Sequence, residues 1–220
     1  MKFIICLLFS IAAFSQTKPL ELKIDTIKSS TDEDNDKKFV LQYHITNLSD
    51  KAISFVLNTK RLIPIGAGSL RPNPYYKVYE NGKSFDAQGI FTREKRKFES
   101  EKAVQNYNDS IINLFTKKTL EQLLAEKRRN FLNNIQKLEP KETLNFEAVL
   151  NWNKQRYFKN DVYEYYIQEK EKYYFELHIN LMKEELLLDF SEEERNEILK
   201  DKTLTKGWYT SNKVLIDFSE

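Results

Sequence analysis

Hydrophobic and polar residues alternate with a period of two along several stretches of the chain, a pattern typical of β-strands that bury one face. The sequence predicts seven such strands. They lie near residues 20–26, 39–45, 53–57, 75–79, 144–150, 173–181 and 214–218. After the fourth, the dipeptide Asn81-Gly82 tolerates positive φ at both central positions, so it predicts a two-residue hairpin turn.

The period changes between the fourth and fifth strands, where apolar residues fall on one helical face. These are Leu120, Leu123, Leu124, Phe131, Ile135 and Leu138. The pattern predicts a helical insertion over residues 94–137, ended by Pro140. One long helix and a helical pair are both open, because Thr119 with Gln122 fits a capping box whereas Asn108-Asp109 fits an earlier helix start.

A second, short helix is predicted at 192–200. Ser191 and Glu194 have the spacing of a capping box, and acidic residues fill the first turn, where the helix dipole favours them.

Strands that do not alternate with helices favour an antiparallel sandwich over a parallel sheet with crossover helices. The strand order resembles that of an immunoglobulin-like domain. The residues that carry the resemblance are Phe39, Leu41, Tyr43, Ile45 and Asn47, then Ile53 and Phe55, then Pro140, Glu142, Leu144 and Phe146, and finally Tyr173 to Leu181. The resemblance implies a mainly β fold, an antiparallel immunoglobulin-like β-sandwich with a helical insertion at 94–137. These residues are generic to the architecture, and the cysteine pair of antibody domains is absent.

Residues 1–15 have the features of a secretory signal peptide: one basic residue, an apolar run from Phe3 to Phe14, and small residues before Gln16. The run is shorter than the roughly 20 apolar residues of a membrane-spanning helix, so no membrane anchor is expected after cleavage. The only cysteine, Cys6, leaves with the leader. The mature protein, residues 16–220, is therefore predicted to be a single extracytoplasmic domain, periplasmic or secreted, that folds without disulfides.

Charge excludes one class of partner. Loss of Lys2 changes 35 basic residues to 34 against 33 acidic ones, a net charge of about +1 with histidine neutral. Such a balance, together with export, argues against a nucleic-acid partner.

Two histidines are the main candidates for acid–base or metal chemistry. His44 and His178 both occupy the polar parity of their strands, which predicts that both face solvent. Placed on the second and sixth strands of an immunoglobulin-like order, they belong to opposite sheets and cannot share a metal. The run Asp32 to Asp36 resembles the start of a calcium loop, but Lys37 and Tyr43 occupy the positions of its glycine and bidentate glutamate, which favours a solvated turn.

No activated nucleophile is visible, since the mature chain lacks cysteine and a Gly-x-Ser-x-Gly turn. Residues Gly66 to Gly68 are interpreted as part of an ordinary loop and not as a phosphate-binding loop, because Pro72 and Pro74 follow where a helix would have to start. We therefore assign no catalytic, cofactor-binding or metal-ligating residue and expect no cofactor.

Aromatic residues crowd one region and suggest either a binding surface or core packing. They are Trp152, Tyr157, Phe158, Tyr163, Tyr165, Tyr166, Tyr173 and Tyr174. The sequence favours an exported, non-enzymatic interaction module for a protein or glycan, in which the helical insertion either covers a sheet edge or presents a surface. Alternatives are a secreted carbohydrate-active hydrolase with two carboxylates about 5–9 Å apart, and a sugar- or peptide-binding module or inhibitor that displays loops.

Overall fold

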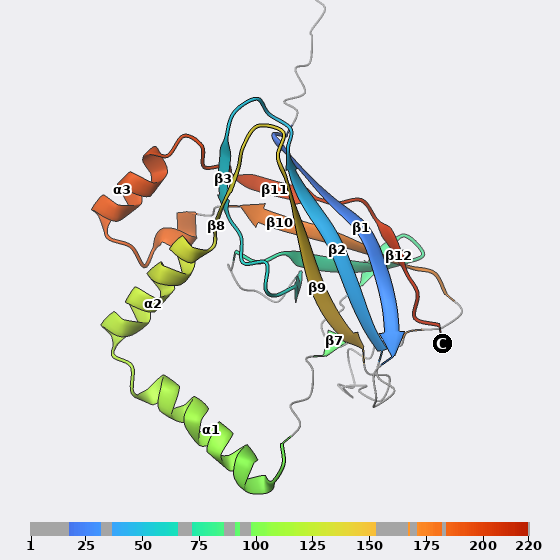
Figure 1. Cartoon of the computed structure of the whole chain (residues 1–220), viewed down its shortest axis with the longest axis horizontal. Helices are drawn as coiled ribbons and strands as arrows, with labels where there is room; N and C mark the ends of the chain where they lie inside the picture. Colours follow the sequence, from blue (N-terminus) through green and yellow to red (C-terminus); the bar gives the residue numbers. More distant parts are fainter. Residues whose placement is uncertain are drawn as a thin grey trace, which may run out of the picture.

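Two β-sheets, which we name the β1 sheet and the β10 sheet after a member strand, form the body of the protein (Figure 1). The structure is a computed structural model that describes residues 18–31, 37–65, 72–85, 91–92, 98–152, 167, 171–181 and 184–219. Within these residues the chain is mainly β, with several antiparallel strand pairings and three α-helices. The mainly β class is thereby confirmed. The signal-peptide residues lie outside the described part.

The β1 sheet has the strand order β1-β2-β9-β7, and every neighbouring pair is antiparallel. Its strands are β1 (Leu20–Thr31), β2 (Lys37–Asn47), β9 (Thr143–Trp152) and β7 (Phe91–Thr92). Phe39, Leu41, Tyr43 and Ile45 alternate along β2 and are all buried, as the period-two pattern predicts.

The β10 sheet has the order β11-β10-β5-β4. Its strands are β11 (Gly207–Thr210), β10 (Tyr173–Leu181), β5 (Tyr75–Glu80) and β4 (Ile63–Pro64), with β12 (Val214–Ile216) also paired to β10 and β6 (Lys83–Phe85) to β5. The β4–β5 pair is parallel and the others are antiparallel. The predicted hairpin is confirmed, since β5 turns into β6 at Asn81 (φ 48°) and Gly82 (φ 79°).

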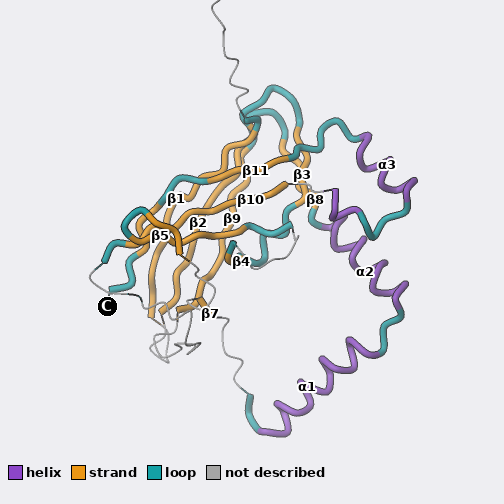
Figure 2. The backbone as a smooth tube through the Cα atoms, turned by 180° about the vertical axis from the view of Figure 1, so that it is seen from behind, coloured by secondary structure: helices purple, strands orange, loops and turns teal. Residues whose placement is uncertain are grey.

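Figure 2 shows the two sheets from behind. One hydrophobic core joins their inner faces. Phe218, near the end of the chain, lies in its aromatic part. The Phe218 ring meets Trp152, Phe39 and Tyr173 edge to face, with centroids 5.0, 5.2 and 5.2 Å apart. Offset and edge-to-face rings at such distances add to the free energy of burial. The C-terminal segment therefore belongs to the core.

A side chain bridges the two sheets at the edge of β1. The pairing register of β1 shifts between Ile24 and Thr26, which leaves Asp25 as a bulge residue. Next to the bulge, the Ile24 amide donates to Asn212 Oδ1 at 2.8 Å, and Asn212 Nδ2 donates back to the Ile24 carbonyl at 3.1 Å. The loop between β11 and β12 thus satisfies backbone groups of β1.

The predicted insertion is a helical pair. The helices are α1 (Glu101–Thr116) and α2 (Leu120–Asn133). Ser100 caps α1, so the alternative start at Asn108-Asp109 is wrong, whereas the capping box of Thr119 and Gln122 is confirmed at α2. The capping box of Ser191 and Glu194 is likewise confirmed at α3 (Glu192–Lys200).

The C-terminal end of the predicted helical segment is a strand instead. Residues 135–138 form β8 (Ile135–Leu138), which pairs with β3 (Ile53–Val56). Tertiary pairing overrides the helical spacing here, because Leu138 is fully buried in the main core and the strand backbone finds partners in β3.

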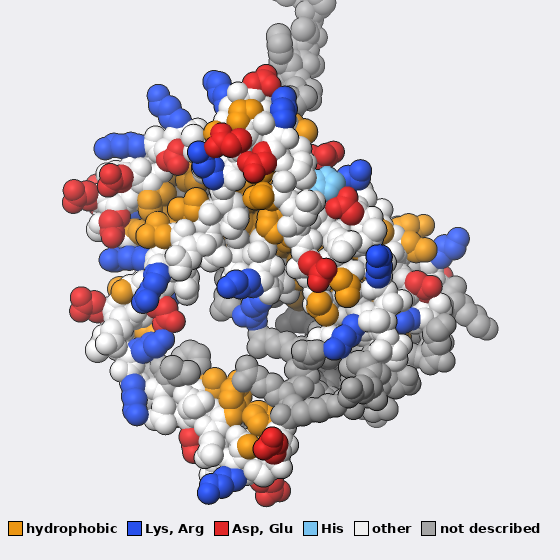
Figure 3. All heavy atoms as spheres, viewed as in Figure 1, with side chains coloured by type: hydrophobic (Ala, Val, Ile, Leu, Met, Phe, Trp, Pro, Cys, Tyr) orange, Lys and Arg blue, Asp and Glu red, His pale blue; other side chains and the backbone are white. Residues whose placement is uncertain are grey.

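Helices α1 and α2 form an arm that curves away from the sheets (Figures 1 and 2). A second, small core holds the C-terminal end of this arm. Phe131 of α2 packs edge to face on Phe190, with ring centroids 5.1 Å apart. The core also contains Val56 of β3 and Leu187 of the 3-10 helix η1 (Glu184–Leu187). Among the described side chains of α1 none is buried. Figure 3 shows an opening between this arm and the β body. No helix in the described ranges is long and apolar enough to cross a bilayer.

Candidate functional site

The outer face of the β10 sheet carries an unusual set of side chains for a face expected to be solvated. Residues directly opposite in a sheet point to the same side, so the strand register arranges this face in four rows. The rows are Asn180 with Trp208, then Tyr75 with His178 and Thr210, then Lys77 with Glu176, and then Tyr79 with Tyr174 and Leu215. We call these residues, with Lys213, the outer β10 face.

Three polar side chains of β10 are buried on this face. Glu176, His178 and Asn180 are 8%, 8% and 6% exposed, although they alternate with the core residues and point away from the core. The expectation that His178 faces solvent is therefore wrong. Its neighbours across the flanking strands are Tyr75 on one side and Thr210 on the other.

A hydrogen-bonded network joins the buried groups. His178 Nε2 lies 2.9 Å from Glu176 Oε2, and the Tyr79 hydroxyl donates to the same carboxylate oxygen. His178 Nδ1 lies 3.2 Å from Thr210 Oγ1. A carboxylate only accepts, so a neutral imidazole donates from Nε2 to Glu176 and accepts at Nδ1 from the Thr210 hydroxyl.

Burial sets the protonation states of this network. It lowers the pKa of His178, against the opposing charge of Glu176, while the positive charges of Lys77 and Lys213 lower it further. Burial also raises the pKa of Tyr79 to about 12, with help from the hydrogen bond to Glu176 and its negative charge. Near neutral pH the network therefore holds a neutral imidazole and a neutral phenol, both hydrogen-bonded to Glu176.

Exposed apolar side chains flank the network at both ends. Tyr174, Trp208 and Leu215 are 39%, 46% and 52% exposed. At one end the rings of Trp208 and Tyr75 lie 6.2 Å apart, and at the other the ammonium group of Lys213 lies 3.7 Å from the ring centre of Tyr79. A cation at that distance is attracted by the ring face.

Asn180, beside Trp208, has an unsatisfied group. Its Nδ2 is buried and has no hydrogen-bond partner among the described residues. A buried amide without a partner costs free energy, and such groups in native structures call for an explanation such as a ligand or an ordered water.

His44 lies in a different setting, on the outer face of the β1 sheet. Its Nδ1 is 2.8 Å from Oδ2 of Asp25, the bulge residue, and its Nε2 is 3.9 Å from Oε2 of Glu21. The carboxylates engage different ring nitrogens, so these three groups do not converge on one point. As expected, His44 and His178 belong to different sheets and are not brought together.

The remaining sequence candidates separate into described and undescribed positions. Trp152 and Tyr173 are core residues, and Tyr174 is part of the outer β10 face. The other members of the predicted aromatic region, the acidic run 32–36 and the segment 66–68 lie outside the described residues. Within the described part, no group of three His, Cys, Asp or Glu side chains is arranged to hold a metal ion.

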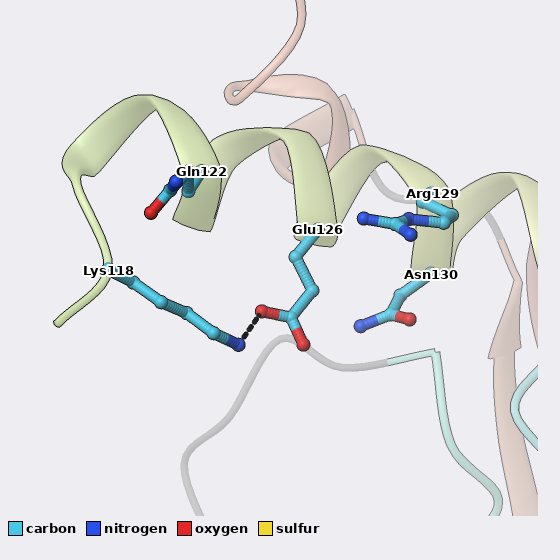
Figure 4. A pocket seen from close by; sticks show the side chains of 5 residues that line it. All are labelled: Lys118, Gln122, Glu126, Arg129 and Asn130. Atoms are coloured by element: carbon cyan, nitrogen blue, oxygen red, sulfur yellow. Dashed lines mark hydrogen bonds and ion pairs between the residues drawn. The ribbon is translucent and has the colours of Figure 1, made fainter. Parts of the chain in front are cut away.

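The arm carries a shallow polar depression of about 430 Å³ on α2 (Figure 4). Its lining residues are Lys118, Gln122, Glu126, Arg129 and Asn130. Lys118 and Glu126 form an ion pair with each other across it, and the positive charge of Arg129 acts on the same carboxylate, so the lining charges partly offset one another. We therefore place the candidate site on the outer β10 face and not on the arm.

Sequence reasoning did not find this site as a unit. The available signal was the longest alternation in the chain, in which Glu176, His178 and Asn180 occupy three successive outward positions. Only the register of β5 and β11 brings Tyr75, Trp208 and Thr210 beside them.

Comparison with known proteins adds no relative. No family model matches the chain, and no curated protein or solved structure is significantly similar to it.

Proposed function

We propose that the protein is an exported, non-enzymatic interaction module that uses the outer β10 face to bind a protein or glycan. The observation that carries the proposal is the combination, on one sheet face, of exposed aromatic side chains with a buried polar network. Exposed aromatic residues are enriched where proteins bind partners, and fixed polar groups give such surfaces specificity.

We also propose an immunoglobulin-like sandwich as the architecture of this module. The order β1-β2-β9-β7 in one sheet and β11-β10-β5 in the other supports it, since these correspond in chain order to A-B-E-D and G-F-C of the immunoglobulin constant type. The core shared by the two inner faces supports it as well.

The hydrogen-bond partners of the buried Glu176 carboxylate favour a binding function over glycoside hydrolysis. In the described part of the chain Glu176 is hydrogen-bonded to a phenol and an imidazole, whereas glycoside hydrolysis needs a second carboxylate across the scissile bond. A carboxylate held in this way is suited to positioning Tyr79 and His178.

Binding by the mature chain, residues 16–220, to immobilised glycan and peptide panels tests the proposal. We expect at least one ligand whose binding is lost in Trp208→Ala and in Tyr174→Ala. The matched control is Val149→Ala, which removes an exposed apolar side chain from the outer face of the β1 sheet and should leave binding intact. Equal effects of all three variants, or no binding at all, would refute it.

The exported protein itself should begin at Gln16 by mass spectrometry.

A further inference from the structure

We infer that the outer β10 face binds an anionic oligosaccharide, a chain of sugar rings that carry carboxylates. The inference rests on the proposed function and names the ligand class for the same surface. It follows from the charge, the spacing and the shape of the face.

The outer β10 face carries more positive than negative charge, because it has two lysines, Lys77 and Lys213, and one carboxylate, Glu176. Lys77 lies opposite Glu176 in the strand register, and Lys213 lies over the Tyr79 ring. The charges of the two lysines also lower the pKa of His178, as expected for cations near the buried network. The Glu176 side chain is buried and hydrogen-bonded to Tyr79 and His178, whereas Lys213 is exposed and Lys77 is partly exposed. A ligand with negative charges complements this arrangement.

The exposed aromatic groups lie at both ends of the face, with Lys77 between them and Lys213 at the Tyr79 end. Successive rows of one sheet face are two residues apart, about 7 Å, so the four rows from Trp208 to Leu215 extend over about 20 Å. That length suits several linked sugar rings. Their apolar ring faces would lie on Trp208 and Tyr174, while their carboxylates would meet Lys77 and Lys213.

A peptide fits this face less well. Peptides that bind β-sheets usually add a strand at an open edge, and peptide helices lie in apolar grooves. The outer β10 face is the broad side of paired strands, where backbone groups of β5, β10 and β11 are already bonded to one another. It offers side-chain hydrogen-bonding groups such as the Thr210 hydroxyl, which match the hydroxyls of a sugar.

Calorimetric titration of the mature chain tests the inference directly. The probes are a short oligogalacturonate, a neutral oligosaccharide of the same length and an oligoglutamate peptide. We expect the oligogalacturonate to bind with an affinity that falls as salt rises, because exposed ion pairs are screened, and we expect the other two probes to bind at least about tenfold more weakly.

Charge reversal assigns the binding to this face. Lys213→Glu should weaken oligogalacturonate binding by about tenfold, since it replaces an attraction with a repulsion. Lys23→Glu makes the same change in net charge at an exposed position of β1 on the other sheet and should have little effect. Thermal unfolding of both variants checks that they remain folded.

The outcomes separate this inference from the proposed function. Preference for the neutral sugar or for the acidic peptide, with Trp208→Ala still abolishing binding, would overturn the anionic-glycan assignment and leave the interaction surface standing. Equal loss in Lys213→Glu and Lys23→Glu would also overturn it, because binding would then follow net charge alone. Absence of any ligand that depends on Trp208 would remove both.

Discussion

His178 is a histidine kept neutral by its surroundings. Sequence parity places it on an outward position, and the structure agrees with that direction, but the side chain is buried by neighbours that belong to other strands. Parity reports only the face to which a residue points. Whether that face is exposed to solvent depends on the size of the side chains on neighbouring strands, and the sequence of one strand does not reveal them.

The neutral state of His178 predicts a loss of stability in mild acid. Its pKa in the folded protein is lowered below the ordinary value of about 6.5, so the unfolded chain takes up a proton that the folded chain does not. The contribution of neutral His178 to the free energy of unfolding is therefore complete above about pH 6.5. Below that pH the free energy of unfolding falls, by at most about 1.4 kcal/mol per pH unit. Urea unfolding at pH 7.5 and 5.5 measures the drop.

His178→Gln should reduce this drop, because glutamine does not titrate and its amide can still donate to Glu176. The carboxylates of Glu194, Asp201 and Asp217 do not titrate between pH 5.5 and 7.5, because hydrogen bonds lower their pKa values. Their contributions to the free energy of unfolding are lost only at more acidic pH. An identical drop in wild type and His178→Gln would show that another group is responsible.

At the level of elements, long alternating strands are predictable and short strands are not. The sequence predicts β1, β2 and β10 because apolar and polar residues alternate along each of them over many positions. β11 has only four residues, and β8 continues the apolar spacing of α2, so neither has a pattern of its own. Both depend on a partner strand that is distant in sequence, and the candidate site depends on β11 for Trp208 and Thr210.

Asn47 shows how one side chain holds elements together. It ends β2, is fully buried, and its Nδ2 donates to the carbonyls of Lys51 at 2.8 Å and Glu139 at 3.0 Å. Its Oδ1 accepts from the Ser49 amide at 2.9 Å. The amide thus joins the turn after β2 to the connection between β8 and β9.

Replacement of Asn47 by alanine should lower the free energy of unfolding by about 2–4 kcal/mol, because several buried backbone groups lose their partner at once. Denaturant unfolding measures the loss. Asn145→Ala, at an exposed position of β9, is the control and should change stability by no more than about 0.5 kcal/mol. A loss of that small size in Asn47→Ala would mean that water replaces the amide.

Across the whole molecule, packing divides the chain into a β body and an arm. The sequence predicts the helical insertion and leaves open whether it covers a sheet edge or presents a surface. The structure shows α1 away from both sheets (Figure 1). The arm is held at the end of α2, where Phe131 packs in the small core and Lys127 and Arg128 contact Asp189. Apolar side chains of α1, including Val104 and Ile112, remain exposed.

This division predicts that α1 is dispensable for folding. α1 has 16 residues and spans about 24 Å, so a Gly/Ser linker of about ten residues is long enough to replace it. The shortened protein should unfold within about 0.5 kcal/mol of wild type and keep the ligand binding of the outer β10 face, because no described side chain of α1 is buried. By contrast, Phe131→Ala should cost about 3–4 kcal/mol, since it leaves a cavity beside Phe190 in the small core. Aggregation or a comparable loss of stability on removal of α1 would instead mean that the helix protects an edge of the β body.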